Sequence, residues 1–330
     1  MILPALYIFP FLISCEIRAV LGCDATEISL LMYATFENRT DIPQHHIGRT
    51  INEIPDDIFL ELDLLNNTFL CKSMFDGLYK LKLLSVTSPE LTDIDADFLE
   101  GQQVEEDISI TFTSVRTIKK HTFNSLKILK LELSWNKIKT LEDESIVNLL
   151  RLRSLYLSYN QIAKLSPESF GNLPQLYELN LMQNRIIDIS ENFFRFLRQK
   201  NVQINLSHNE LYSLDRVFVA LMADNVFLFL SYNHLEYLSA EMFEGPHFTQ
   251  ILVTHNYISS ISTDFFQNDI HVDYLDMSFN PLDNETLQNL IIWATANNRT
   301  FYCSLCAGTS IHKKGVFVFV VIFFSKSLLL

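Results

Sequence analysis

An apolar pattern that recurs about every 24 residues constrains the fold of this chain more than any other feature. It is clearest at residues 128–141 (ILKLELSWNKIKTL) and returns at residues 152–165 (LRSLYLSYNQIAKL) and 176–189 (LYELNLMQNRIIDI). The ninth place of the unit is held by Pro89, then by Thr113, and then seven times in succession by asparagine. These asparagines are Asn136, Asn160, Asn184, Asn209, Asn233, Asn256 and Asn280. A repeat of this length predicts units that stack into a solenoid.

Each unit contains the signature of a short strand. The fourth and sixth places are apolar and alternate with polar ones, as at Leu131 and Leu133, which indicates a strand with one buried face. The asparagine follows where the backbone leaves the strand. Its amide can bind main-chain groups that a buried turn would otherwise leave unpaired. We therefore expect the asparagines to form a hydrogen-bonded ladder along the solenoid.

A large apolar residue recurs ten places after the asparagine. The column consists of Phe123, Phe170, Phe194, Phe243 and Phe266, with Leu99 and Ile146 as aliphatic substitutes. Large rings bury much area, so this column is expected to fill the wide outer side of each coil as core and to bind no ligand.

The units follow the motif L-x-x-L-x-L-x-x-N-x-L over most of the chain and resemble the leucine-rich repeat family. The resemblance implies an α/β solenoid, namely a leucine-rich repeat horseshoe. Such a horseshoe has a parallel sheet on its concave face, an irregular or helical convex side, and terminal caps.

Composition and motifs argue against several functions. The formal net charge is −14, which disfavours nucleic acid or anionic lipid as a partner, because phosphate contacts need clustered Lys and Arg. The sequence contains no G-x-S-x-G elbow, H-E-x-x-H helix or phosphate-binding loop. His208 and His255 lie two repeats apart, roughly 10 Å at the spacing of strands, too far to share one ion. We expect no catalytic residues, no metal and no cofactor.

The N-terminus and the glycosylation motifs indicate secretion. Residues 2–13 form an apolar run, no Lys or Arg precedes Arg18, and residues 1–22 are predicted to be a signal peptide cleaved before Cys23. The site also loosely resembles that of a bacterial lipoprotein. Five N-x-S/T motifs favour a eukaryotic secretory route instead. They begin at Asn38, Asn66, Asn205, Asn284 and Asn298.

The cysteines outside the predicted signal lie at the two ends of the repeat array. Three pairings are available to Cys23, Cys71, Cys303 and Cys306, and we favour Cys23 with Cys71 and Cys303 with Cys306. The C-x-x-C spacing of the second pair could instead suggest zinc or redox chemistry, but no second pair or nearby histidine completes a site. Residues 23–80 are predicted to form an N-terminal cap with irregular first repeats, and residues 81–280 the regular repeats.

Residues 281–306 are predicted to form a helical C-terminal cap. Leu287, Leu290, Ile291 and Ala294 recur at helical spacing. The segment resembles the C-terminal cap of extracellular leucine-rich repeat proteins, although Asp283 stands where that cap usually has a cysteine.

The tail, residues 307–330, leaves three interpretations open. Residues 315–324 are almost wholly apolar but too few to span a membrane, which takes about 20 residues. The tail is a GPI-anchor signal with a short polar spacer, an incorrectly predicted gene end, or an ordinary disordered or packed tail.

Residues that are not buried on the predicted strands would face the concave surface. Aromatic residues there are typical anchors for protein ligands. The candidates for partner binding are Trp135, Tyr156, Tyr159, Phe229 and Tyr232. They could instead be residues that are common at these places of the repeat and pack only against one another. A glycan on Asn205 would project from the same face, in which case an edge, the convex side or a cap would carry recognition.

We therefore expect a secreted, non-enzymatic protein-binding module. Its architecture resembles short secreted insect leucine-rich immune proteins that lack a coiled coil, and this resemblance implies that it binds immune factors or pathogen surfaces in innate immunity. A homo- or hetero-oligomer is compatible with this expectation. The alternative is a GPI-anchored or otherwise surface-attached adhesion or receptor protein.

Overall fold

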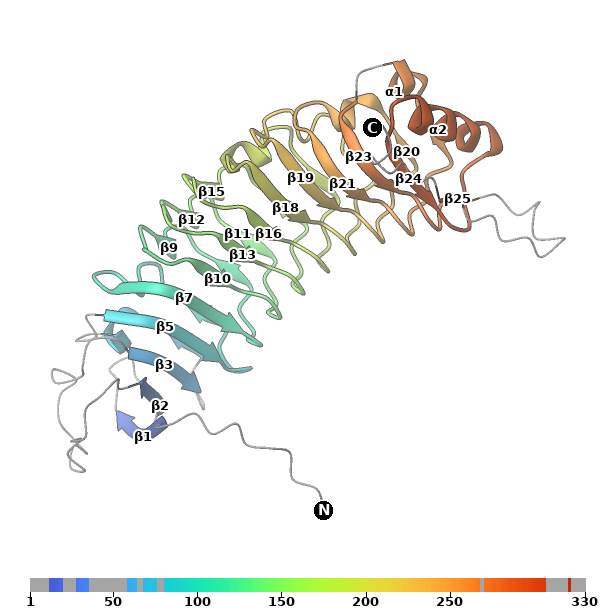
Figure 1. The fold of residues 1–330 in the computed structure, drawn as a ribbon. Helices are drawn as coiled ribbons and strands as arrows, with labels where there is room; N and C mark the ends of the chain where they lie inside the picture. The colour runs from blue at the N-terminus through green and yellow to red at the C-terminus, as the bar shows by residue number, and fades with distance from the viewer. Residues whose placement is uncertain are drawn as a thin grey trace.

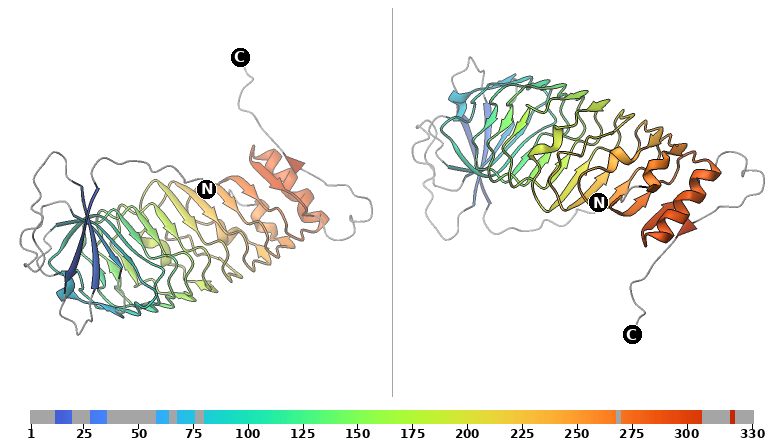
Figure 2. Two further views of the ribbon diagram at one scale, coloured as in Figure 1. Left: turned by 90° about the horizontal axis from the view of Figure 1, so that it is seen from below. Right: turned by 90° about the horizontal axis from the view of Figure 1, so that it is seen from above.

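The computed structural model describes the backbone of residues 12–19, 28–35, 58–63, 68–75, 80–267, 270–306 and 320–321. The described chain winds into an elongated, curved stack of coils (Figure 1; Figure 2). Each turn of the chain adds one strand to a main sheet along the inner side of the curve, as Figure 1 shows.

The main sheet has 14 strands and runs in parallel from β3 to β24. Its register follows the sequence repeat, so that Leu131 pairs with Leu155 and Leu155 with Leu179. The parallel strands are β3 (Ile58–Asp63), β5 (Lys80–Thr87), β7 (Gln103–Thr111), β10 (Lys130–Glu132), β13 (Ser154–Tyr156), β16 (Glu178–Asn180), β18 (Asn201–Asn205), β19 (Asn225–Phe229), β21 (Phe248–Leu252), β23 (Val272–Asp276) and β24 (Thr300–Cys303). The parallel sheet predicted from the repeat is confirmed.

Antiparallel strands close both ends of this sheet. At the N-terminal end, β1 (Leu12–Ala19) pairs with β2 (Ile28–Thr35), and β2 pairs with β3. β1 lies within the segment predicted to be a signal peptide. At the other end, β25 (Val320–Val321) pairs with Tyr302 and Cys303 of β24. The rest of residues 307–330 lies outside the described residues.

The convex side is mostly irregular and carries short elements. Two-residue strands pair from one repeat to the next: β4 (Phe69–Leu70), β6 (Asp93–Ile94), β8 (Thr117–Ile118), β9 (Phe123–Asn124), β11 (Thr140–Leu141), β12 (Ile146–Val147), β14 (Lys164–Leu165), β15 (Phe170–Gly171), β17 (Asp188–Ile189), β20 (Tyr237–Leu238) and β22 (Ser260–Ile261). Single helical turns are η2 (Lys72–Phe75), η3 (Phe193–Phe196), η4 (Ala240–Phe243) and α1 (Thr263–Gln267). The longest helix is α2 (Asn284–Ala296). No described helix is long and apolar enough to cross a membrane.

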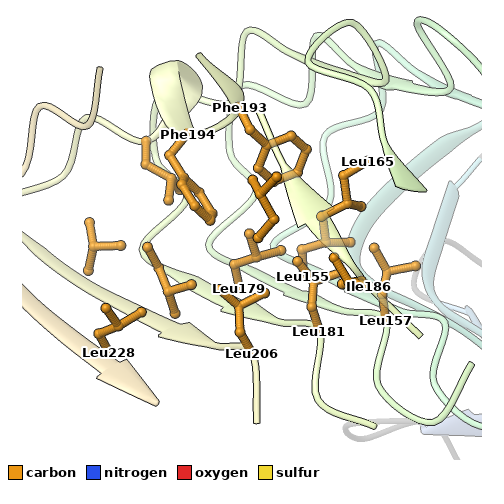
Figure 3. Close-up of a cluster of buried hydrophobic side chains, with 14 of the residues drawn as sticks. Leu155, Leu157, Leu165, Leu179, Leu181, Ile186, Phe193, Phe194, Leu206 and Leu228 are labelled. Carbon is orange, nitrogen blue, oxygen red and sulfur yellow. The ribbon is translucent and has the colours of Figure 1, made fainter. Parts of the chain in front are cut away.

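One continuous apolar core runs between the two sides of the coils. Strand leucines such as Leu155 and Leu179 point toward the phenylalanines of the convex side, among them Phe193 and Phe194 (Figure 3). Phe123, Phe170, Phe194 and Phe243 of the predicted column are buried. In the unit of α1, however, the fully buried ring is Phe265, and Phe266 is only partly buried. The helical turn of α1 shifts the inward direction by one residue, which the repeat spacing does not reveal.

The asparagines form a ladder that joins successive turns. Asn160 Nδ2 donates to the carbonyl of Leu133 at 2.9 Å and to that of Leu157 at 3.0 Å, while its Oδ1 accepts from the N–H of Ile138 at 3.0 Å. Asn184 bonds in the same way one repeat further on. All seven side chains are buried. At the N-terminal end, Thr113 stands in place of an asparagine, and its N–H and hydroxyl both donate to Asn136 Oδ1.

Helix α2 closes the C-terminal end of the core. Asp283 caps it, because its Oδ1 accepts from the N–H of Thr286 at 2.6 Å. Leu290 and Trp293 are buried on the last coil, and a disulfide joins Cys303 to Cys306. Asp283 thus has a structural role where the related caps have a cysteine. Cys71 is also disulfide-bonded, and Cys23, its predicted partner, lies outside the described residues.

Replacing a ladder asparagine should destabilise the solenoid. In Asn160→Ala or Asn184→Ala, several buried main-chain groups would lose their partner, at about 1 to 3 kcal/mol for each variant. Urea denaturation followed by circular dichroism measures this loss. Gln183→Ala, an exposed neighbour, is the control and should unfold like the wild type. Equal stability of all three variants would contradict a stabilising role for the ladder.

Candidate functional site

The concave strands present the fifth place of each repeat to solvent. Residues at this place are half-buried, while the places on either side are buried in the core. They are Glu132, Tyr156, Asn180, Asn205, Phe229, Leu252 and Asp276. Two of the predicted binding residues, Tyr156 and Phe229, therefore lie on the concave sheet.

The other three predicted binding residues lie beyond the sheet. Trp135, Tyr159 and Tyr232 stand three residues after the last residue of β10, β13 and β19, in the turn at the carboxyl edge of the sheet. Their backbone is left-handed, with φ of 61°, 54° and 59°. This conformation costs a non-glycine residue roughly 1 to 2 kcal/mol. The turn is held by bonds to the next repeat, for example from the N–H of Trp135 to the carbonyl of Ser158 at 3.0 Å.

The left-handed turns align the eighth-place side chains into stacks. The rings of Trp135 and Tyr159 lie 3.7 Å apart with an interplanar angle of 7°. Tyr232 is sandwiched between His208 at 4.3 Å and His255 at 4.2 Å. Because neighbours cover the faces of these rings, the stacks present ring edges to solvent. These rings therefore contact one another along the edge of the sheet.

Tyr156 is bound into a polar network on the concave face. Its hydroxyl donates to Glu178 Oε2 at 2.7 Å, and the Ser154 hydroxyl donates to the same oxygen at 2.9 Å. The ammonium of Lys130 lies 4.8 Å from the centre of the Tyr156 ring. Burial, followed by the hydrogen bond to Glu178, raises the pKa of Tyr156 to about 12. Both the hydroxyl and one ring face are thus already engaged within the protein.

Phe229 belongs to a larger apolar group that we name the concave aromatic patch. The patch consists of Phe227, Phe229, Leu252, Tyr274 and Tyr302, all half-buried. Phe229 pairs with Leu252 in register, and Asp276 with Tyr302. Tyr274 is close enough to Asp276 and Tyr302 that both contribute, after burial, to raising its pKa.

Most residues of this patch were not predicted from the sequence. Phe227 and Tyr274 occupy the third place of their units, two residues before Phe229 and Asp276. The period-2 alternation, extended by one step toward the start of each strand, would have found them. Tyr302 lies in the C-terminal cap, and only the pairing of β23 with β24 places it beside the repeats.

Asn205 borders the concave aromatic patch. It pairs in register with Asn180 on one side and with Phe229 on the other. Its Oδ1 accepts from the N–H of Ser207 at 3.0 Å, which leaves the Nδ2 atom that a glycan would occupy. A glycan there would stand directly beside Phe229.

The described residues offer no evident metal site. No group of three or more His, Cys, Asp or Glu among them is arranged to hold an ion. His208 and His255 lie on opposite faces of the Tyr232 ring. What the concave face offers is apolar and hydrogen-bonding contact.

Comparison with known proteins identifies the repeat. A family model described as leucine rich repeat matches residues 106–162, 130–186 and 151–211. Residues 106–211 thus match the leucine rich repeat family, and the described chain has the fold of a solenoid. A search of curated protein sequences found no match to this chain.

Several solved structures have a similar fold. The TLR13–ssRNA13 complex aligns with a TM-score of 0.56 and 24% identity, over 65% of this chain and 30% of that one. The Toll–Spatzle complex from Drosophila aligns with a TM-score of 0.56 and 19% identity, over 68% and 30%. The mouse RP105/MD-1 complex aligns with a TM-score of 0.53 and 21% identity, over 71% and 44%. The leucine-rich repeat solenoid thus spans less than half of each of these proteins, and at this identity the likeness establishes the fold.

The network around Tyr156 makes its titration a test of the site geometry. An ordinary tyrosine is largely ionised at pH 11, whereas Tyr156 should remain protonated there because its pKa is raised to about 12. The Glu178→Gln variant removes the neighbouring negative charge and should lower the pKa of Tyr156, although burial keeps part of the shift. NMR of ring-labelled tyrosine, with Tyr156→Phe to assign the signal, measures both values. Ionisation of Tyr156 near pH 10 in the wild type would rule out the described network.

Proposed function

We propose that this leucine-rich repeat solenoid is a non-enzymatic module that binds a protein ligand through its concave aromatic patch. The observation that carries the proposal is the grouping of Phe227, Phe229, Leu252, Tyr274 and Tyr302 on four adjacent strands. Rings fixed on a rigid sheet lose little conformational entropy on binding, and aromatic residues are enriched among the anchors of protein interfaces.

A protein ligand fits the patch better than a nucleic acid does. The strands β19, β21, β23 and β24 contain no Lys or Arg, so a phosphate group would meet no cation on them. The similar structures include both kinds of ligand by their titles: Spatzle and MD-1 are partners in two complexes, and RNA in the TLR13 complex. RNA is therefore the competing ligand that an experiment has to exclude.

We further propose that the protein is secreted and acts in recognition in innate immunity. The predicted signal peptide, the glycosylation motifs and the disulfide between Cys303 and Cys306 favour an oxidising, extracellular compartment. The likeness in fold to the Toll–Spatzle complex, whose title names innate immunity, is in keeping with an immune role. A surface-attached adhesion or receptor protein is the alternative, favoured by the apolar run at residues 315–324.

Removing the patch should abolish ligand capture. We expect Phe229→Ala combined with Tyr302→Ala to weaken binding by about 2 kcal/mol or more, roughly 30-fold, because these side chains would be central anchors. Partners are captured from extracellular fluid on the immobilised protein, identified by mass spectrometry, and their affinity for purified wild type and variant is compared.

The matched control removes two exposed apolar side chains elsewhere. Tyr177 and Leu150 lie outside the concave strands, and the variant that combines Tyr177→Ala with Leu150→Ala should bind the ligand like the wild type. Single-stranded RNA is tested in parallel over a range of salt concentrations. Partner capture that survives loss of the patch, or salt-dependent RNA binding in its place, would overturn the proposal.

Secretion predicts a defined mature chain. Expressed in insect cells, the protein should appear in the medium beginning at Cys23, with a glycan on Asn205, as intact-mass and peptide mass spectrometry would show. If the glycan shields Phe229, Asn205→Gln should capture more partner than the wild type. Retention on the cell surface, with release by a phospholipase specific for GPI anchors, would favour the surface-attached alternative. An unprocessed intracellular chain would refute both.

A further inference from the structure

The turns at the carboxyl edge of the main sheet form a continuous lateral surface, which we name the edge strip. It comprises residues 112–116, 135–139, 159–163, 183–187, 208–212, 232–236, 255–259 and 279–283. Backbone bonds tie adjacent turns together, from the N–H of Gln161 to the carbonyl of Ile138 at 2.8 Å and from Arg185 to Ile162 at 2.9 Å. The strip is therefore a rigid row of turns with the spacing of neighbouring strands.

Charge is segregated along the edge strip. The first four turns contain Arg116, Lys137, Lys139 and Arg185, all exposed, and no acidic residue. The last four turns contain the exposed Glu210, Glu236 and Asp283 and no Lys or Arg. In a chain whose net charge is −14, half of this strip is positive and the other half negative.

Several cations on the other faces of the solenoid pair with carboxylates across repeats, as Lys119 does with Asp93, Arg195 with Glu168, and Arg216 with Glu191 and Glu244. Other exposed cations, such as Lys127 and Lys164, have no such partner among the described residues. Within the part of the chain that the structure describes, none of the four edge cations has a carboxylate within ion-pair distance. The ammonium of Lys137 donates to the Ser114 hydroxyl, at 3.0 Å. The strip thus offers positive charge without a carboxylate partner at one half and exposed carboxylates at the other, of which Asp283 also caps α2.

Exposed apolar side chains lie where the two halves meet. Ile187 in the last basic turn is 43% exposed, and Tyr212 in the first acidic turn is 55% exposed. Exposed apolar side chains continue along the strip on both sides of this point, among them Phe112 and Tyr257, and a specific protein interface usually combines an apolar core with a polar rim.

We infer that the edge strip joins two copies of this chain, side by side and antiparallel. A two-fold axis between the turns 183–187 and 208–212 places every turn of one half opposite a turn of the other half of the second copy. Arg185 then faces Glu210 of the other copy, and Arg116 faces Asp283. Ile187 and Tyr212 meet beside the axis. A two-fold arrangement repeats each of these contacts, because the same strip serves both copies.

The remaining turns also fit this register. Lys137 and Lys139 lie opposite the exposed ring of Tyr257, where a cation over an aromatic ring is attractive. Glu236 lies opposite the turn 159–163, beside Lys139 of the neighbouring turn. An antiparallel pair therefore matches the charges, whereas a parallel pair would set Arg185 against Arg185.

A nucleic acid is a poorer occupant of the basic half. Trp135 is stacked between Phe112 at 5.7 Å and Tyr159 at 3.7 Å, so its faces are not open to a base.

The strip extends about 34 Å at the strand spacing. A strip of this length buries on the order of 1,000 Å² in total, near the lower limit for a specific interface. We therefore expect a reversible dimer with a dissociation constant in the micromolar range, independent of any ligand on the concave face.

The test is a charge swap followed by analytical ultracentrifugation of the full secreted chain. Wild type should dimerise, and the dissociation constant should rise with salt concentration. Arg185→Glu and Glu210→Arg should each weaken the dimer at least tenfold, because each sets like charges together twice. The combined variant restores opposite charges and should return to within threefold of wild type.

Controls make each outcome decisive. Lys127→Glu changes an exposed cation that precedes β10, away from the edge strip, and should dimerise like the wild type. Thermal melts verify that each variant is folded, and Ile187→Ser, which changes no charge, should also weaken the dimer. A monomeric wild type at several hundred micromolar, or a charge swap that fails to restore association, would overturn the inference. Unaltered capture of the concave ligand by the Arg185→Glu variant would show that the two surfaces act separately.

Discussion

The hydrogen bonds of the buried asparagines are the constraint on which the rest of this solenoid depends. Each chain turn leaves the sheet through the interior edge of the coil, where its main-chain groups cannot reach water. Asn160 satisfies carbonyls of two successive repeats and an N–H of the earlier one. The bonds therefore close each turn and also hold it at a fixed distance from the next. The amide of asparagine supplies two N–H donors and an acceptor at once, whereas the hydroxyl of Thr113, at the end of the row, has a single hydrogen to donate.

Because the coils stack at a fixed spacing, residues at the same place of successive repeats form a column, and each column has its own environment. The fourth and sixth places line the core, the fifth lies on the concave face, and the eighth lies in the left-handed turn at the edge. Neighbours in a column are about 4.8 Å apart, so that side chains interact mainly with the same place in adjacent repeats. The stacks around Trp135 and Tyr232 and the ion pairs of Arg195 and Arg216 follow from this geometry.

The columns give the molecule two surfaces with different chemistry. The concave aromatic patch is apolar and rigid, as suits the anchors of a protein ligand. The edge strip is charged with opposite signs at its two ends, as suits a second copy of the chain. Because the strip lies beyond the ends of the strands, occupation of one surface leaves the other accessible. Ligand binding and self-association can then coexist on one solenoid.

The sequence by itself determined the repeat, the parallel sheet, the inward leucines and the asparagine places, because the same burial and the same backbone hydrogen bonds recur in every unit and make the pattern periodic. The tertiary structure alone decided where exposed side chains lie relative to one another. The period could not show that Trp135, Tyr159 and Tyr232 leave the sheet in a left-handed turn, or that α1 buries Phe265 in place of Phe266. Nor could it place Tyr302 beside the repeats, or show that the described edge cations have no carboxylate within ion-pair distance. These features depend on contacts between side chains of different repeats. Such side chains are some 24 positions apart, and nothing in the sequence indicates which of them touch.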